Sequence, residues 1–237
     1  MLHVPAYSRR VAAVLLAAAG IVMFGLLLES IAGDWGLADL DWPILDGLAA
    51  HRSAPLTAAA EALRAASGPL VTMGAAAAIA LAWGVARREL WRPALLLGAS
   101  LADFLLVTGA RLWVGRARPP AWFEAVGGID APAFPAVHTS GALTLLLVAL
   151  YLAYSRRASA RGLGSAAVSA GIVALAVAGC DLYLGRHWLT DVVAAWAISA
   201  VVLAAVVWID ALRLPAHAGA ARPAGSEVAG SRSPADT

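Results

Sequence analysis

Six long runs of apolar residues alternate with shorter polar segments along the chain. The runs cover residues 11–28, 70–86, 93–110, 140–154, 163–179 and 188–209. Their lengths are close to the roughly 20 apolar residues that an α-helix needs to cross a bilayer. This pattern predicts an all-α fold, a polytopic membrane bundle of about six transmembrane helices.

The composition supports a membrane protein. The 237 residues are 61% hydrophobic and 14% charged, and the mean hydropathy is +0.78. A soluble domain carries roughly 25% charged residues. We divide the chain into an N-terminal segment 1–10, one six-span membrane domain 11–213 and a tail 214–237. The tail is rich in Pro, Ala, Gly and Ser, so it is predicted to be disordered.

The first run has two interpretations. The small residues after it, Ser30-Ile31-Ala32, resemble a signal-peptide cleavage site. Its apolar core, however, exceeds the ~7 to 15 residues usual for such a signal. We interpret the run as a retained membrane anchor.

The basic residues, which are all arginine, predict the orientation of the bundle. With six spans, one side receives most of them: Arg9, Arg10, Arg87, Arg88, Arg92, Arg156, Arg157, Arg161 and Arg213. The positive-inside rule makes that side the cytoplasm, so we expect both termini there, in a plasma membrane of bacterial type. Because the net charge is only +2, nucleic acid is not an expected partner.

The opposite face should carry the loops of residues 30–68 and 111–139. Arg111, Arg116, Arg118 and Arg186, which lie in or beside the candidate motifs, fall on this side against the trend. Guanidinium groups bind phosphate oxygens through two parallel hydrogen bonds. The four together indicate an anionic ligand, although any one of them alone could extend to the lipid headgroups instead.

His187 and Asp191 stand four residues apart where the last apolar run begins. At helical spacing they would share one face, and the carboxylate would accept one ring N–H and raise the basicity of the other nitrogen. This arrangement is typical of a histidine nucleophile or base. The alternative is an interfacial hydrogen bond without chemistry.

His138 lies at the start of the fourth run. The free N–H groups and the dipole of a helix N-terminus favour an anion there, which suits an acid that protonates a leaving oxygen. The alternative is a polar residue exposed to water. Asp103, inside the third run, is expected to face the bundle interior as a structural polar contact.

Three segments, residues 111–119, 135–138 and 180–191, resemble the type-2 phosphatidic acid phosphatase superfamily. This superfamily includes lipid phosphate phosphatases, bacterial undecaprenyl pyrophosphate phosphatases and vanadium haloperoxidases. Its pattern is Lys, six residues, Arg-Pro; then Pro-Ser-Gly-His; then Ser-Arg, five residues, His, three residues, Asp. The matching residues are Arg111 in the place of the lysine, Arg118, Pro119, Pro135, His138, His187 and Asp191. Order and spacing are all met.

The second motif departs from the pattern at two positions. Ala136 in place of serine removes a hydroxyl that would donate to a phosphate oxygen, at a cost of about 1 to 3 kcal/mol in a buried site. Val137 in place of glycine puts a branched side chain where the backbone should approach the ligand, so we expect it to crowd the pocket.

In the third motif, Cys180 and Asp181 replace Ser-Arg. Cys180 is interpreted as a small buried residue. Asp181 is the serious change, because an anion replaces a phosphate-binding cation and repels phosphate unless it is paired. We expect Asp181 to pair with Arg186 or Arg111, which leaves Arg118 as the main phosphate ligand.

The resemblance implies a phosphatase without metal or other cofactor, acting on a lipid-linked phosphomonoester or pyrophosphate at the outer face. In the implied mechanism His187 attacks phosphorus to form a phosphohistidine, Asp191 orients it, and His138 protonates the leaving oxygen. Arg111 and Arg118 hold the phosphoryl oxygens. Arg186 and Val137 complete the expected substrate-binding set.

Two alternatives stay open, and two others are disfavoured. The changes at positions 136, 137 and 181 favour a relative that binds or senses lipid phosphates without efficient catalysis. Transfer of the phosphoryl or headgroup to an alcohol would use the same histidines. A transporter would leave the ordered arginines unexplained, and a haloperoxidase is disfavoured because those relatives are soluble. The lipid and the oligomeric state are not encoded in any motif.

Overall fold

A computed structural model describes residues 6–125, 131–155 and 160–213. Within these residues the regular structure consists of eight α-helices and two short 3₁₀ helices, without strands. Six helices are long and apolar enough to cross a membrane: α1 (Ala6–Gly33), α4 (Pro69–Arg87), α5 (Trp91–Val114), α6 (Val137–Tyr154), α7 (Ala160–Tyr183) and α8 (Leu189–Leu212). Each overlaps one predicted run, so the six-span, all-α prediction is confirmed. The tail 214–237, Arg156 and Arg157 lie outside the described residues.

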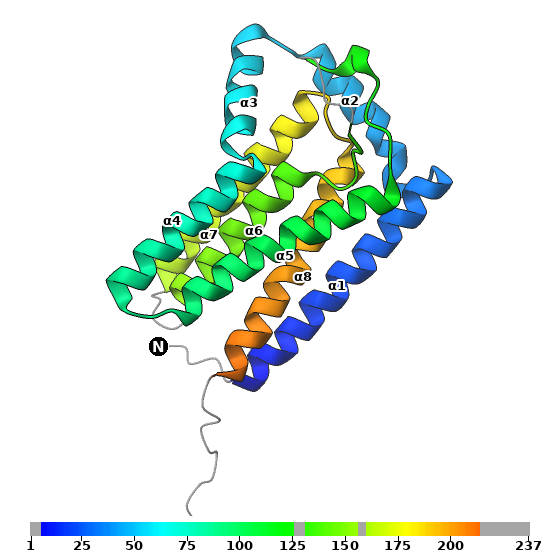
Figure 1. Cartoon of the computed structure of the whole chain (residues 1–237). Helices are drawn as coiled ribbons and strands as arrows, with labels where there is room; N and C mark the ends of the chain where they lie inside the picture. The colour runs from blue at the N-terminus through cyan, green and yellow to red at the C-terminus, as the bar shows by residue number, and fades with distance from the viewer. Residues whose placement is uncertain (1–5, 126–130, 156–159, 214–237) are drawn as a thin grey trace, which may run out of the picture.

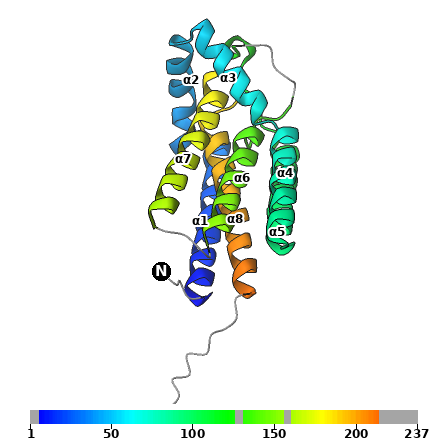
Figure 2. The same cartoon turned by 90° about the vertical axis from the view of Figure 1, so that its left-hand side faces the viewer.

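The four remaining elements are short and lie in the connections. Between α1 and α4 the chain forms η1 (Gly36–Leu40), α2 (Asp41–Ala50) and α3 (Ala54–Ala66), and η2 (Ala121–Phe123) lies between α5 and α6. Helices α2 and α3 sit together at one end of the bundle, which we call the outer end (Figures 1 and 2). All six long helices have one end there, because α1, α5 and α7 end, and α4, α6 and α8 begin, on this side.

Helix α3 begins in a way that is common for helices, with a serine at its N-cap and a proline in its first turn. Ser53 is its N-cap residue and Pro55 lies in its first turn, but the serine hydroxyl makes no capping bond. The helix packs against α7 through Ala60, which is buried beside Tyr183 and Leu184. Leu56, in contrast, is half exposed.

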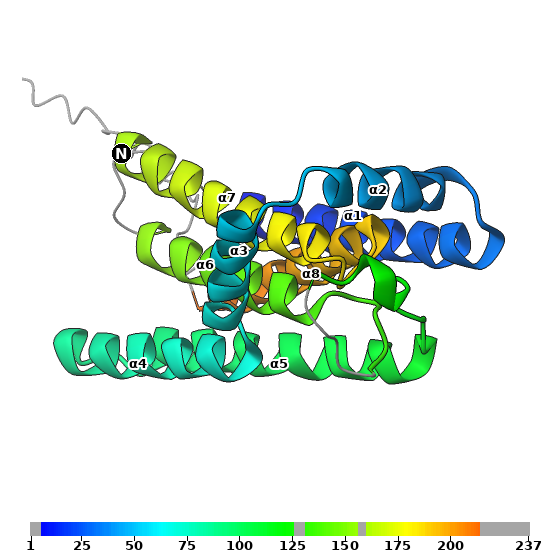
Figure 3. The ribbon, with the colours of Figure 1, turned by 90° about the horizontal axis from the view of Figure 1, so that it is seen from above.

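The bundle is layered around α8. Helix α1 lies along α8, whereas α4 and α5 form a separate layer on the other side of α6 (Figures 2 and 3). Helices α1 and α8 approach closely at Gly20, because a Cβ there would lie 2.8 Å from the carbonyl oxygen of Ala197. Small residues permit such close approach in membranes, where packing rather than water exclusion holds helices together.

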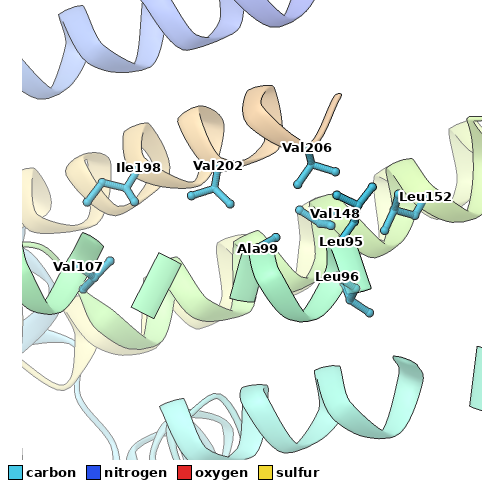
Figure 4. Close-up of a cluster of buried hydrophobic side chains, with 9 residues drawn as sticks. All are labelled: Leu95, Leu96, Ala99, Val107, Val148, Leu152, Ile198, Val202 and Val206. Carbon is cyan, nitrogen blue, oxygen red and sulfur yellow. The ribbon is translucent and has the colours of Figure 1, made fainter. Parts of the chain in front are cut away.

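The largest apolar cluster joins α5, α6 and α8 (Figure 4). Its members are Leu95, Leu96, Ala99, Val107, Val148, Leu152, Ile198, Val202 and Val206. Side chains from three helices therefore interlock along the length of the bundle.

A polar contact lies within the same three helices. Asp103 of α5 is buried and accepts hydrogen bonds from the hydroxyls of Ser140, at 2.6 Å, and Thr144, at 2.8 Å, both on α6. Ser199 of α8 lies 3.5 Å from Ser140. Asp103 thus faces the bundle interior, as expected, and its partners are structural.

The contact at Gly20 predicts a stability difference between two glycines of α1. Gly20→Ala should destabilise the bundle by about 1 to 3 kcal/mol, because the added methyl group overpacks the α1–α8 contact. Gly25→Ala is the matched control, since no atom lies within 4 Å of a Cβ at Gly25. Thermal unfolding in detergent should show a lower midpoint for the first variant alone. Equal midpoints for the two variants would contradict the packing described here.

Candidate active site

His187 lies in the turn between α7 and α8, and its side chain is fully buried. The prediction that it shares a helical face with Asp191 is wrong, because α8 begins only at Leu189 and its N-cap residue is Trp188. The turn depends on Gly185, whose φ is +71° and whose missing Cβ leaves room for the Phe123 carbonyl. The fold nevertheless brings the pair together, with 3.4 Å between His187 Nδ1 and Asp191 Oδ2.

Asp191 is held from two sides. Its Oδ2 accepts the backbone N–H of Trp188 at 2.8 Å, which caps the first turn of α8. Its Oδ1 accepts Arg116 Nη1 at 2.6 Å. The carboxylate is fully buried, so these bonds determine where it lies relative to the imidazole of His187.

Arg116 links this carboxylate to helix α2. Its Nη2 donates to Asp41 Oδ2 at 2.7 Å, and its Nη1 also donates to the hydroxyl of Thr190 at 2.6 Å. Asp41 in turn accepts the backbone N–H of Thr190 at 2.9 Å. Arg116 was expected to serve an anionic ligand, but two carboxylates of the protein already occupy it. Asp41 carried no signal in the sequence beyond being one acidic residue in an outer loop.

Arg111 and Arg118 come from the end of α5 and the loop after it. Arg111 donates to the carbonyl of Pro132, and Arg118 donates to the carbonyls of Ala131 and Arg186, each at 2.7 Å. Burial lowers the pKa of Arg118, and the charges of Arg111, Arg64 and Arg186 lower it further. The four guanidinium groups therefore form a crowded positive cluster at the outer end.

His138 is in the first turn of α6, beside this cluster. Its Nδ1 is buried and has no hydrogen-bond partner among the described residues. A Cβ on Gly68 would lie 4.0 Å from its Nε2, so the junction of α3 and α4 covers one side of the ring. His187, Arg64 and Arg111 are close enough for their charges to act on His138. The three sequence motifs thus meet in one place.

The two altered positions of the second motif lie in apolar surroundings. Ala136 is fully buried in a cluster with Ala178, Val192 and Ala195. Val137 packs against the core cluster of α5, α6 and α8, and it lines a small cavity with residues of α4 and α5. No described residue of the motif has a positive φ, so the conformation there does not require glycine. Val137 is therefore placed to pack rather than to crowd the phosphate.

The third motif differs from expectation in its ion pair. Asp181 is fully buried, and its Oδ2 accepts the hydroxyl of Thr139 at 2.8 Å. Among the described residues its ion-pair partner is Arg64 of α3, with 3.4 Å between Nε and Oδ1, rather than Arg186 or Arg111. Cys180 is only partly buried, against the apolar cluster of Ala60, Tyr183 and Leu184, whereas the sequence predicted a buried residue.

Arg64 was missed although a signal for it existed. It lies in the outer segment 30–68, where the positive-inside rule does not call for arginine. Arg64 and Arg52 stand in the same relation to this rule as Arg186, but α3 carries no motif that would distinguish either of them.

Comparisons with known proteins bear on the family and the fold. Residues 92–214 match the family model of the PAP2 superfamily. A search of curated protein sequences found no match. Among solved structures, the chain is similar to the crystal structure of the first transmembrane PAP2 type phosphatidylglycerolphosphate phosphatase from Bacillus subtilis, with a TM-score of 0.76 at 20% identity. The alignment covers 84% of this chain and 98% of that chain, so the two share a fold.

The link between Asp41 and Arg116 predicts a further stability difference. Asp41→Asn should lower stability by about 1 to 3 kcal/mol, because a largely buried guanidinium loses one of its two charged partners. Asp46→Asn in the same helix is the control, since Asp46 is exposed. Thermal unfolding in detergent measures both. A midpoint for Asp41→Asn that equals that of the control would show that the link carries no stability.

Proposed function

Because the chain belongs to the PAP2 superfamily, we propose that it is a membrane phosphatase that hydrolyses a lipid-linked phosphomonoester or pyrophosphate. Phosphatidic acid, phosphatidylglycerolphosphate and undecaprenyl pyrophosphate represent the substrate class. The observation that carries the proposal is the meeting of His187, Asp191 and His138 beside a cluster of arginines. Phosphoryl transfer needs this combination of nucleophile, proton donor and fixed positive charge.

His187 is suited to be the nucleophile. Its Nδ1 lies 3.4 Å from Asp191 Oδ2 without a hydrogen bond between them. A small approach of the two groups would place the ring proton on this nitrogen and leave the lone pair on Nε2. Nε2 is buried without a hydrogen-bond partner among the described residues. In the first step Nε2 bonds to phosphorus while the bond from phosphorus to the lipid oxygen breaks.

His138 is suited to be the acid and base. Protonated, it gives its proton to the leaving lipid oxygen, which departs as an alcohol or as a lipid monophosphate. A water molecule then attacks the phosphohistidine, and His138 takes one of its protons as the bond between phosphorus and nitrogen breaks. Inorganic phosphate leaves, and both histidines return to their starting states.

Arg111 and Arg118 are suited to hold the phosphoryl oxygens. Each uses part of its guanidinium to bind a backbone carbonyl, and these bonds fix the position of the positive charge. Donors that are already in place stabilise the charge that develops in the transition state without having to reorganise.

The arrangement of arginines supports an outer-face site. Arg9, Arg10 and Arg92 bind residues at the end of the bundle opposite the histidines, among them Ser155 and Ala211. The positive-inside rule assigns that opposite end to the cytoplasm. The histidines would then face the extracytoplasmic side, where lipid phosphates are within reach of the bilayer surface.

The central prediction concerns His187. His187→Ala should lower the release of phosphate from micellar lipid phosphates, without divalent metal, by at least about 10³-fold, because the nucleophile is lost. His51→Ala is the matched control, since His51 also lies at the outer end but is exposed. A colorimetric phosphate assay on detergent-purified protein measures both. Turnover by His187→Ala near that of the wild type would exclude His187 as nucleophile.

One observation favours a second candidate function. Asp181 stands where the family pattern has a phosphate-binding arginine, which is what a relative that binds lipid phosphates without hydrolysing them would show. Purified in detergent, such a protein would be protected against thermal unfolding by micellar phosphatidic acid and would release no phosphate. Transfer to an acceptor alcohol is distinguished by product analysis with an added alcohol, because a phosphorylated alcohol would then appear among the products.

A further inference from the structure

The positive charge that the third motif lacks has a replacement elsewhere in the chain. Position 181 carries a carboxylate instead of the family arginine, and the guanidinium of Arg64 lies against that carboxylate from helix α3. Helix α3 lies outside residues 92–214, which the family model matches. No family motif therefore assigns a role to Arg64.

Asp181 is built to hold Arg64 rather than to meet a ligand. The carboxylate is fully buried, and Thr139, the residue after His138, donates its hydroxyl to Oδ2. This bond leaves Oδ1 to face Arg64 Nε at 3.4 Å. The charge of Asp181 is thus turned toward the arginine, so it positions the guanidinium and repels an incoming phosphate less.

The outer half of the Arg64 guanidinium remains available. Only its Nε faces Asp181, and among the described residues its two terminal nitrogens have no hydrogen-bond acceptor. The side chain keeps 18% of its surface exposed. Two parallel N–H donors that lie partly buried beside a reactive histidine match the oxygens of a phosphoryl group.

The surrounding charges also favour an anion at this place. Burial lowers the pKa of Arg64, Asp181 opposes this effect, and the like charge of Arg186 adds to it. The neighbouring Arg118 is affected in the same way by Arg64. A bound phosphate would relieve the repulsion between these guanidinium groups, which the nearby carboxylates balance only in part.

We propose that Arg64 is a phosphate-binding residue of the active site, supplied by α3 and held by Asp181 in place of the family's motif arginine. The expected loss of activity rests on the proposed function, whereas the expected loss of phosphate binding does not depend on it. Asp181 acts as a positioning residue. The altered third motif then moves the guanidinium to another helix instead of removing it.

The test combines two substitutions at the ends of the pair. Arg64→Ala should lower kcat/KM for micellar phosphatidic acid by about 10²-fold, as the loss of one transition-state donor does. It should also raise, at least tenfold, the concentration of inorganic phosphate that is needed to protect the protein against thermal unfolding. Adding Asp181→Arg to Arg64→Ala restores the arginine of the family motif. The double variant should exceed Arg64→Ala at least tenfold in kcat/KM and should need at least tenfold less phosphate for protection. Asp181→Arg alone should lower activity, because Arg64 loses its partner.

Two further variants control for the loss of a positive charge at this end of the bundle and for a failure to fold. Arg52→Ala removes the same charge from the same end of the bundle, where Arg52 donates to the carbonyl of Tyr183, and it should leave phosphate protection unchanged. Arg64→Lys keeps the positive charge beside Asp181 but lacks the two parallel N–H donors of a guanidinium, so its loss of phosphate protection should be intermediate. This variant replaces Arg64→Ala if Arg64→Ala fails to fold. Phosphate protection of Arg64→Ala or Arg64→Lys equal to that of the wild type would overturn the proposal. So would a folded double variant no better than Arg64→Ala.

The two measurements also separate this proposal from the proposed function. If the wild type hydrolyses none of the lipid phosphates, the phosphatase proposal fails. Protection by inorganic phosphate that is lost in Arg64→Ala and recovered in the double variant would still support Arg64 as a phosphate ligand of a binding protein.

Discussion

The buried carboxylate of Asp191 organises the outer end of the bundle. It caps the first turn of α8, it lies beside the imidazole of His187, and it binds Arg116, which is tied to Asp41 of α2. Burying a carboxylate away from water costs free energy unless hydrogen-bond donors and positive charges surround it. The same donors that satisfy this requirement also define where α8 begins, and so the position of the histidine before it. The start of α8 and the position of the histidine therefore depend on the same carboxylate.

The arginines at this end differ in role because they differ in partners. Arg116 is shared between two carboxylates, so it has a structural task. Arg118 binds backbone carbonyls, which orient a guanidinium without neutralising it. Arg64 binds one carboxylate through one nitrogen and keeps its other donors available. Arginines in the outer loops therefore indicate that an anion site exists, but the contacts of each arginine decide whether it belongs to that site.

The membrane part supplies the rigidity that this end needs. Interlocked side chains of α5, α6 and α8, the polar contact at Asp103 and the close approach at Gly20 hold the helices in register. The first motif starts at the end of α5, the second leads into α6, and the third leads into α8. Positioning reactive groups on rigid elements keeps them within the small tolerance that phosphoryl transfer allows.

The sequence by itself determined the six spans and the three motifs, because the length of an apolar run and the spacing of chemical groups are local properties that bilayer thickness and reaction chemistry constrain directly. Tertiary structure alone decided that Asp181 pairs with Arg64, that His187 precedes its helix, and that Val137 packs against α4 and α5. Spans that are apolar on nearly every face carry no periodic signal for their rotation. The pairing of residues more than a hundred positions apart therefore emerges only when the helices pack.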